Sequence, residues 1–195
     1  FGLAVHATLE GGGVAGRDVL VTGCGPIGVM NVAVARALGA AQVIATDVNQ
    51  VRLAQAKQFG ADRTIDVTTE DPVKITRDMT GGRGADVVFE YAGRADTLAQ
   101  SIDALASGGD LRLIGAPDDP IPVDVTRWIL KGITARAIPG RKLFESWEHA
   151  SRLVDSGKID LAPLVSHRLP LREGLRSFEL IERGKAVKVL VIPES

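Results

Sequence analysis

The chain is 195 residues long and nearly neutral, with 23 Lys and Arg against 24 Asp and Glu. Because no basic run accompanies this balance, nucleic acid and anionic membrane surfaces are excluded as the main partner. The composition is 45% hydrophobic and 24% charged, as in a globular chain, and the single cysteine excludes a disulfide framework or a cysteine-rich zinc site and indicates a reducing, cytoplasmic setting. The longest uncharged run, residues 19–35, is too short and too rich in glycine to span a membrane.

Strand and helix patterns alternate along the first 140 residues. Apolar stretches predict strands at residues 19–22, 42–46, 63–67, 86–90, 110–115 and 133–138. Helices are expected between them at residues 29–38, 50–59, 72–79, 96–107 and 125–131. Asn49, Asp71 and Asp124 stand at N-cap positions, and a glycine pair follows residue 107. Such an alternation indicates a parallel sheet covered on both faces, and right-handed crossovers then predict a doubly wound α/β fold with strand order 3-2-1-4-5-6.

The pattern changes after Gly140. Two stretches carry apolar residues at helical spacing, and each is expected to pack one face: Leu143, Trp147, Ala150 and Val154, then Leu171, Leu175, Phe178 and Ile181. A final strand is predicted at residues 187–192. We therefore expect the doubly wound unit at residues 1–140 and a C-terminal segment, 141–195, that belongs to a second, mostly missing domain. Since the chain starts with Phe1 rather than Met, it is expected to be a piece of a longer protein.

A glycine fingerprint follows the first predicted strand. Gly23-x-Gly25-x-x-Gly28 stands between an apolar strand and an uncharged helix, and Asp47 follows 19 residues later at the end of the next strand. This context is typical of dinucleotide-binding sites. The first glycine permits the turn, the second lets backbone approach a diphosphate, and the third brings helix and strand together. The N–H groups from about Ile27 onward would face the phosphates. A glycine-rich turn in an unrelated α/β protein is the alternative.

Asp47 bears on the choice between two dinucleotides. Its carboxylate can accept hydrogen bonds from the adenosine ribose of NAD, whereas NADP would bring a phosphate to the same place. Like charges about 4 Å apart repel by roughly 4 kcal/mol at an effective dielectric near 20, so NAD is the expected cofactor. The alternative is that Asp47 only caps the region of Asn49. Two interpretations are open for Arg52: its side chain lies along the same ribose, or it is an ordinary solvated residue of the following helix.

Several stretches resemble the zinc-dependent medium-chain alcohol/polyol dehydrogenases over essentially the whole chain. Residues 18–30 resemble the cofactor loop of that family, and residues 47–54 and 60–62 fit the same group. Gly140-Arg-Lys-Leu-Phe-Glu-Ser-Trp147, together with residues 156–163 and 166–168, is more similar to its threonine-oxidising branch than to sorbitol or liver-type enzymes.

The resemblance implies a Rossmann fold and an NAD site, and it assigns roles by position. The residues expected to bind the cofactor are Gly23, Gly25, Pro26, Ile27, Gly28, Asp47, Arg52, Ile114, Gly115, Ala116, Ile138 and Pro139. Pro139 departs from many relatives, and as a proline it has no N–H to donate. Catalytic residues and zinc ligands are implied only in a domain ahead of Phe1, so zinc is expected in the full-length enzyme alone.

Metal ligands are not expected in this chain. Cys24 sits inside the phosphate loop and is expected to fill space, while His6, His149 and His167 are scattered without the spacing of a metal site. The histidines' own roles stay open, although packing or hydrogen bonding is favoured over metal binding for His167.

The function implied by the resemblance is the NAD-binding portion of an enzyme that oxidises a secondary alcohol. L-Threonine is the expected substrate, giving 2-amino-3-oxobutanoate and NADH, and the isolated chain is expected to bind NAD without catalysis. A sorbitol- or butanediol-type dehydrogenase and a stand-alone NAD-sensing module are alternatives, and Asp47 counts against an NADPH-linked quinone reductase. The partners expected are NAD, a small alcohol and a second copy of the chain, which would pair through the edge strand at residues 133–138.

Overall fold

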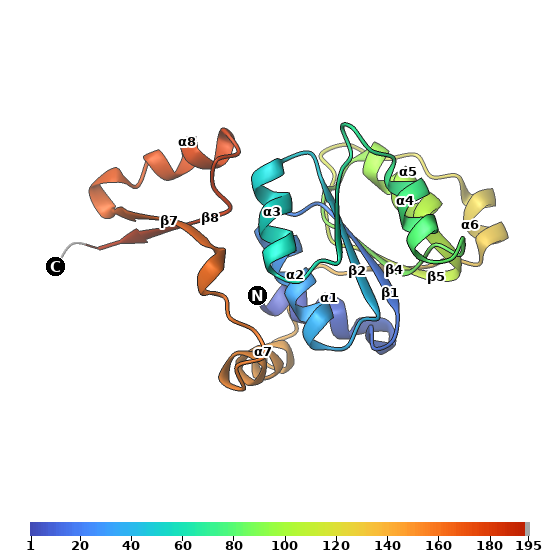
Figure 1. Cartoon of the computed structure of the whole chain (residues 1–195), viewed down its shortest axis with the longest axis horizontal. Helices are drawn as coiled ribbons and strands as arrows, with labels where there is room; N and C mark the ends of the chain where they lie inside the picture. The colour runs from blue at the N-terminus through green and yellow to red at the C-terminus, as the bar shows by residue number, and fades with distance from the viewer. Residues whose placement is uncertain (194–195) are drawn as a thin grey trace.

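The strand order predicted from the sequence is confirmed in the computed structural model, which describes residues 1–193. Over these residues, six parallel strands form one sheet in the order β3-β2-β1-β4-β5-β6 (Figure 1). Their bounds are β1 Asp18–Thr22, β2 Gln42–Asp47, β3 Arg63–Asp66, β4 Ala85–Glu90, β5 Leu105–Leu113 and β6 Thr134–Ala137. The order reverses between β1 and β4, and such a switch point opens a crevice at the carboxyl ends of the strands.

Helices cover both faces of this sheet. Their bounds are α1 Gly2–Leu9, α2 Pro26–Ala37, α3 Gln50–Gln58, α4 Pro72–Met79, α5 Ala95–Ala104 and α6 Val125–Lys131. Alternation along β1 shows why there are two layers. Val19 and Val21 join a core with α1, α2 and α3, whereas Leu20 joins a second core with α4, α5 and α6 on the opposite face. None of the described helices has the length and hydrophobicity needed to cross a bilayer.

The three predicted N-caps are confirmed. The Asn49 side chain accepts hydrogen bonds from the N–H groups of Val51 and Arg52, at 2.9 and 3.2 Å, and so begins α3. Asp71 caps α4 and Asp124 caps α6 in the same manner. A short polar side chain before each of these helices therefore satisfies N–H groups that have no partner inside the helix.

The predicted end of α5 was wrong. The helix ends at Ala104 rather than at residue 107, and β5 already begins at Leu105, which pairs with Ala85. The cause is a distant lysine. Nζ of Lys131 donates to the carbonyls of Ile102, Asp103 and Leu105 at 2.6–3.2 Å, so it satisfies acceptors at the end of the helix. The predicted start of α2 at residue 29 also moves, to Pro26, because proline fits the first turn of a helix.

The C-terminal segment contains helices and a small second sheet. Its elements are α7 Glu145–Asp155, β7 Val165–Pro170, α8 Arg176–Glu182 and β8 Lys188–Ile192, with short 3₁₀ turns at Glu10–Gly12, Ala162–Leu164 and Leu171–Glu173 along the described chain. β7 and β8 pair in parallel. The final strand matches its prediction, whereas the predicted elements did not include β7. In Figure 1 this sheet and α8 lie beyond α3, away from the large sheet.

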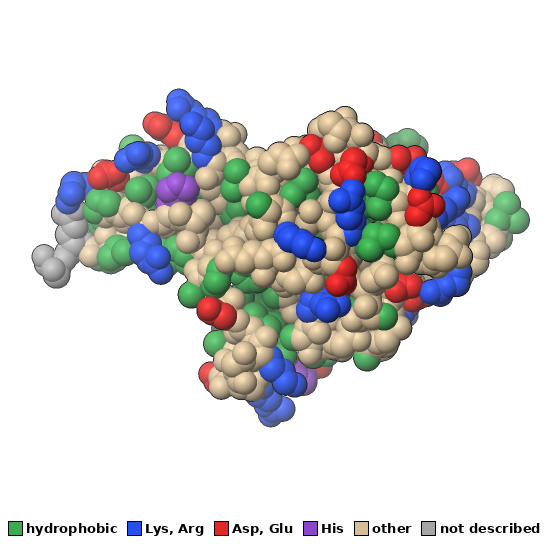
Figure 2. Space-filling model, in the orientation of Figure 1, with side chains coloured by type: hydrophobic (Ala, Val, Ile, Leu, Met, Phe, Trp, Pro, Cys, Tyr) green, Lys and Arg blue, Asp and Glu red, His purple; other side chains and the backbone are tan. Residues whose placement is uncertain are grey.

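The apolar faces predicted to pack in this segment are mostly exposed, so that expectation was wrong. On α7 the buried side chains are Ser146 and Leu153, whereas Trp147 and Val154 are 47% and 42% exposed. Along α8 and the turn before it, the exposed residues are Leu171, Leu175, Phe178 and Ile181. Green apolar atoms are accordingly visible over this part of the surface in Figure 2. The spacing identified apolar stripes correctly, but within residues 1–193 no element covers most of them.

Candidate dinucleotide site

The loop between β1 and α2 needs glycine at its two ends. Gly23 has a positive φ of 92°, and its N–H donates to the carbonyl of Thr46 at 2.8 Å. At Gly28 an added Cβ would lie 2.0 Å from the carbonyl oxygen of Gly23. No side chain fits that space, so the third glycine lets the start of α2 lie against the loop.

The middle glycine is not required by the protein itself. Gly25 has an ordinary φ of −61°, and an added Cβ would meet no described atom within 4 Å. A residue with a side chain would therefore fit the folded chain at this position. The open space lies at the start of α2, where Pro26 begins the helix and no side chain of residues 1–193 forms a cap. The N–H groups of Ile27 and Gly28 thus stay available to an anion that approaches over Gly25.

Asp47 connects this loop to the next strand. Its Oδ2 accepts from the N–H of Cys24 at 2.7 Å, and its Oδ1 accepts from the N–H of Asn49 at 2.9 Å. Nη1 of Arg52 lies 3.9 Å from the same carboxylate. An ionised carboxylate has about four acceptor positions, so two remain for ribose hydroxyls. The capping role that the sequence left open is therefore present, and it leaves acceptor capacity for a ligand.

Cys24 contributes packing and one weak hydrogen bond. It is fully buried, and its Sγ lies 3.4 Å from the carbonyl of Thr46, to which it donates. Burial, followed by the charge of Asp47, raises the pKa of this thiol, so it stays protonated and is a poor metal ligand. This placement agrees with the space-filling role expected from the sequence.

Glu90, at the end of β4, is a buried acid at the carboxyl edge of the sheet that the sequence reasoning did not single out. It is 2% exposed, and its carboxylate accepts from the N–H groups of Ala92 and Gly93 at 3.0 Å and from Oγ1 of Thr97 at 2.9 Å. Burial raises the pKa of this carboxyl, and these hydrogen bonds oppose the shift. The available signal was an acidic residue at the end of an otherwise apolar strand, directly before a turn with glycine.

The segment after β5 lies against the turn that Glu90 holds. An added Cβ on Gly115 would be 2.3 Å from the nitrogen of Gly93, so the two turns touch. The N–H groups of Ile114 and Gly115 both donate to the main-chain carbonyl of Glu90, at 2.9 and 2.8 Å. These two residues therefore keep their carbonyls, and not their N–H groups, for a ligand. Ala116 directly follows them.

The segment after β6 is also limited to acceptors. The N–H of Ile138 donates to the carbonyl of Leu113 at 2.9 Å, and Pro139 has no N–H. Beyond them, residues 136–142 line a cavity of about 590 Å³ together with His6 of α1 and Glu10, which directly follows that helix. The residues predicted from the resemblance thus fall into two groups at the carboxyl edge of the sheet. Gly23–Gly28, Asp47 and Arg52 lie at one end, and the segments after β5 and β6 lie at the other.

Metal-binding groups do not gather in the described part of the chain. Among residues 1–193 no three His, Cys, Asp or Glu side chains lie close enough to hold a metal ion. His6 is buried on α1, His149 lies on α7 and His167 is partly buried on β7. The residues present therefore do not fit a zinc ion.

Comparison with known protein families agrees with this geometry. A family model described as zinc-binding dehydrogenase matches residues 26–156, which is more than half of the chain. The chain belongs to the zinc-binding dehydrogenase family. It is 46% identical over 193 residues to the L-threonine 3-dehydrogenase of Bacillus subtilis (strain 168), covering 98% of this chain and 55% of that protein. It is 40% identical over 195 residues to the L-threonine 3-dehydrogenase of Symbiobacterium thermophilum, covering 99% of this chain and 55% of that protein.

Solved structures of dehydrogenases share the fold. An alcohol dehydrogenase from Thermus sp. ATN1 superposes with a TM-score of 0.93 at 32% identity, over 99% of this chain and 57% of that one. The 2R,3R-butanediol dehydrogenase from Bacillus subtilis superposes with a TM-score of 0.89 at 26% identity, over 99% and 55%. This zinc-binding dehydrogenase chain therefore spans just over half the length of its relatives.

Proposed function

We propose that this chain binds NAD as the dinucleotide-binding portion of a dehydrogenase acting on a secondary alcohol. The observation that carries the proposal is the combination at the first crossover. An open space lies above Gly25, the α2 N-terminus has no side-chain cap, and the buried carboxylate of Asp47 stands beside both. A diphosphate fits the first two features, and an adenosine ribose fits the third.

NAD is favoured over NADP at this position. Asp47 is 8% exposed and would lie close to a 2′-phosphate, so the like charges would repel each other in a partly desolvated place. Even half of the repulsion of about 4 kcal/mol corresponds to more than a tenfold difference in affinity. Arg52 lies near enough to Asp47 to contact the same ribose.

The substrate proposed for the complete protein is L-threonine. Relatives named L-threonine 3-dehydrogenase are 35–46% identical over nearly the whole chain, whereas the butanediol enzyme is 26% identical. When bound, NAD would accept a hydride from the alcohol carbon while the 3-hydroxyl of threonine loses its proton, which gives the ketone of 2-amino-3-oxobutanoate. The residues of this chain bind and orient the cofactor, and this chain alone is expected to leave threonine unoxidised.

A titration with NADH tests the proposal. The chain is expected to show saturable binding, followed by the fluorescence of the reduced nicotinamide. Gly25→Val is expected to abolish binding, because its side chain enters the open space, while the Tm stays within roughly 3 °C of the wild type. Ala41→Val, which lies before β2 at the opposite edge of the sheet, is the matched control and should bind normally. No binding by the wild-type chain would refute the proposed function.

A separate measurement addresses the substrate. The complete protein, supplied with zinc, is expected to form NADH faster with L-threonine than with sorbitol, butanediol or simple alcohols. Faster turnover of butanediol would support the alternative dehydrogenase type.

We also propose that two copies of the chain pair through β6. This strand is at the edge of the described sheet, and α6 beside it exposes Val125, Ile129 and Leu130 by 61%, 73% and 80%. An unpaired edge next to apolar side chains favours association with a second sheet edge. Light scattering after size-exclusion chromatography measures the resulting mass.

A further inference from the structure

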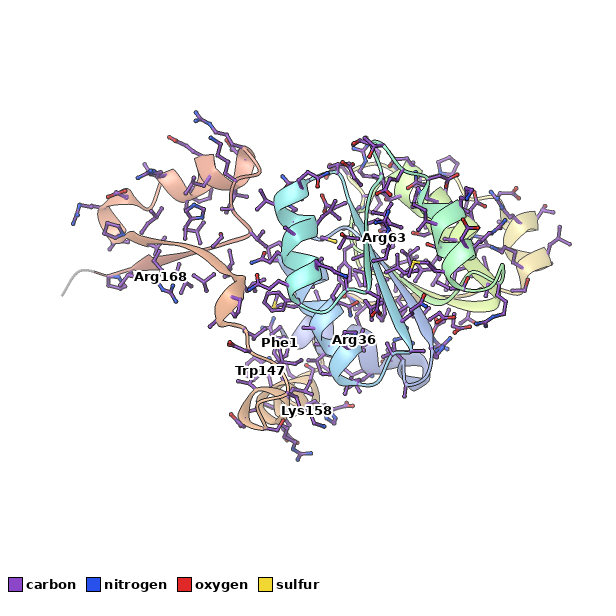
Figure 3. The ribbon with its side chains drawn as sticks, in the orientation of Figure 1. Phe1, Arg36, Arg63, Trp147, Lys158 and Arg168 are labelled. Atoms are coloured by element: carbon purple, nitrogen blue, oxygen red, sulfur yellow. The ribbon has the colours of Figure 1, made fainter. Side chains whose placement is uncertain are left out.

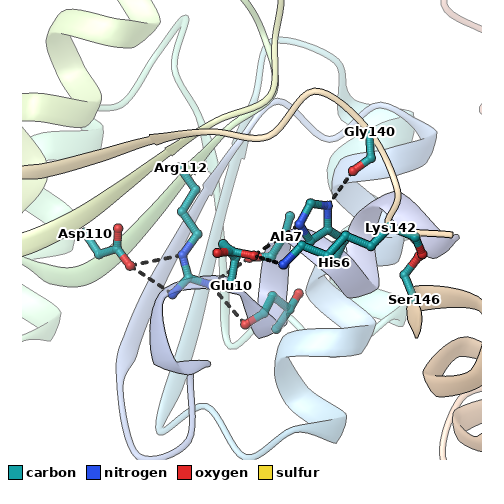
Figure 4. Close-up of polar contacts among 9 residues, drawn as sticks. His6, Ala7, Glu10, Asp110, Arg112, Gly140, Lys142 and Ser146 are labelled. Atoms are coloured by element: carbon teal, nitrogen blue, oxygen red, sulfur yellow. Dashed lines mark hydrogen bonds and ion pairs between the residues drawn. The ribbon is translucent and has the colours of Figure 1, made fainter. Parts of the chain in front are cut away.

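The loop that follows β6 is attached to α1 by a buried histidine. We call residues 138–142 the Gly140 loop. Nδ1 of His6 contacts the carbonyl oxygen of Gly140, and His6 is 8% exposed (Figure 4). A carbonyl oxygen can only accept, so Nδ1 carries the proton of this hydrogen bond. The contact joins residues 134 positions apart in sequence.

A second contact holds the end of the same loop. Nζ of Lys142 lies 2.7 Å from Oε2 of Glu10, and the same carboxylate oxygen lies 3.2 Å from Nε2 of His6. The carbonyl of Lys142 then accepts from the N–H and Oγ of Ser146 at the start of α7. The loop is thus held at two points, by His6 of α1 and by Glu10, which directly follows that helix.

Gly140 has little else to hold it. An added Cβ there would meet no described atom within 4 Å, and its φ is not in the positive region. Ile138, two residues earlier, is 4% exposed and is fixed by its N–H bond to Leu113. Between this fixed residue and Lys142, the hydrogen bond to His6 therefore sets the direction of the Gly140 carbonyl, and with it the turn that follows Pro139.

The same bond is not what keeps α1 in place. The C-terminal half of α1 is held separately by Arg112 of β5, whose Nη1 donates to the carbonyls of Ala7 and Thr8 at 2.7 and 3.0 Å. Figure 4 shows the two sets of contacts side by side on α1. Loss of the His6 side-chain donor should therefore release the Gly140 loop and leave the helix attached to the sheet.

We propose that His6 is a positioning residue that orients the Gly140 loop for the nicotinamide half of the cofactor. This inference rests on the proposed NAD site, in which Ile138 and Pro139 present their carbonyls to that half. His6 acts through the loop without touching the ligand. The adenosine half lies at the other end of the sheet edge, at Asp47, so its binding is independent of His6.

Two polar variants separate the contacts of the ring. His6→Asn places an amide N–H near the Nδ1 position, facing Gly140, whereas His6→Gln places its amide near the Nε2 position, facing Glu10 and away from Gly140. NADH and ADP-ribose are each titrated into the wild-type chain and both variants. His6→Gln is expected to weaken NADH by about tenfold, the value of one net hydrogen bond, and to change ADP-ribose by less than twofold. His6→Asn is expected to bind both as the wild type does.

The outcomes are distinct. An equal loss of NADH and ADP-ribose affinity, or no loss of either in His6→Gln, would overturn the positioning role, as would a His6→Asn variant as weak as His6→Gln. His149→Gln on α7 is the control for exchange of a histidine elsewhere and should leave both affinities unchanged. If the wild-type chain binds neither ADP-ribose nor NADH, the NAD site itself is refuted. That result differs from a failure confined to His6, in which the wild-type chain still binds both ligands.

Discussion

Removal of Asp110 should destabilise this chain far more than removal of an ordinary surface acid. Arg112 is fully buried on β5, and its Nε and Nη2 donate to Oδ2 of Asp110 at 3.2 and 3.0 Å. Nη1 donates to Ala7 and Thr8, and Nη2 also reaches the carbonyl of Gly13 at 3.1 Å. All five guanidinium N–H groups are therefore satisfied, and the guanidinium lies 5.0 Å from the ring centre of Phe89.

Asp110→Ala leaves a buried cation without its counter-charge. Burial lowers the pKa of the Arg112 guanidinium and the charge of Asp110 opposes that shift, so loss of the acid exposes the full cost of burying the charge. Breaking a buried pair in this way costs about 3–5 kcal/mol, which corresponds to a fall in Tm of roughly 10 °C for a chain of this length.

A double-mutant cycle isolates the pair from the general effects of substitution. Arg112→Met keeps an unbranched apolar side chain over Phe89 but removes the side-chain donor from the carbonyls of Ala7 and Thr8, while the Gly13 carbonyl keeps Nη1 of Arg17. Once the arginine is gone, removal of Asp110 should add less than about 1 kcal/mol, because that acid then has only the half-exposed Arg136 nearby. Urea denaturation followed by circular dichroism measures all four free energies of unfolding. A coupling energy below about 0.5 kcal/mol would show that the ion pair does not dominate this core.

Five further substitutions test four other parts of the structure. Asp47→Asn removes the negative charge beside the glycine loop, so NADH affinity should fall about tenfold and NADPH should bind nearly as well; titrations with an unchanged preference for NADH would contradict this role. Gly28→Ala places a Cβ against the carbonyl of Gly23, so the Tm of this variant should fall by roughly 10 °C. Gly25→Ala should melt within about 2 °C of the wild type, because its Cβ meets no described atom. Equal melting temperatures for the two variants would show that the loop adjusts freely. Glu90 has a folded-state pKa above its ordinary value of 4.5, so the folded protein binds the proton more tightly than the unfolded chain does. The stability of the wild type relative to Glu90→Gln should therefore decrease as the pH rises above 4.5. A stability difference that stays constant or increases with pH, measured by denaturation at several pH values, would refute this sign. Leu130→Lys on α6 should shift the mass measured by light scattering from a dimer toward a monomer, and an unchanged dimer would place the interface elsewhere.

The sheet could be predicted because its information is local. Apolar stretches, short polar caps and glycines after helices each act within a few residues, and together with the handedness of crossovers they specify the strand order. Asn49 and Asp124 illustrate this, since each caps the helix that directly follows it. The glycine loop is local in the same sense, because Gly28 fits against Gly23 only five residues away.

The errors came from contacts between residues far apart in the chain. The end of α5 depends on Lys131, which lies on another helix and cannot be associated with α5 from spacing alone. Arg112 stands between two leucines of β5, and its partners on α1, about 105 residues earlier in the chain, become visible only when β5 and α1 are brought together. Trp147 shows the opposite case. Its helical spacing predicted an apolar stripe, but spacing cannot show whether another surface covers that stripe; in Figure 3 it lies near Phe1 on the outer side of the chain.

The distribution of hydrogen-bond donors and acceptors along the sheet edge supports one orientation of a dinucleotide. At the first crossover the N–H groups of Ile27 and Gly28 remain available, and donors suit a negatively charged diphosphate. At the far end the N–H groups are used within the protein or missing, as for Ile114, Gly115, Ile138 and Pro139. Carbonyl groups remain there as hydrogen-bond acceptors. They suit the carboxamide NH₂ group of a nicotinamide, because that group is a neutral hydrogen-bond donor. If NAD binds as proposed, a ligand with phosphates at both ends would meet acceptors without donors at the second position, so we expect the edge to disfavour such a ligand. In the proposed NAD complex, the bond from His6 to Gly140 would keep the neighbouring carbonyls pointing in fixed directions, as a site that recognises its ligand through carbonyls requires.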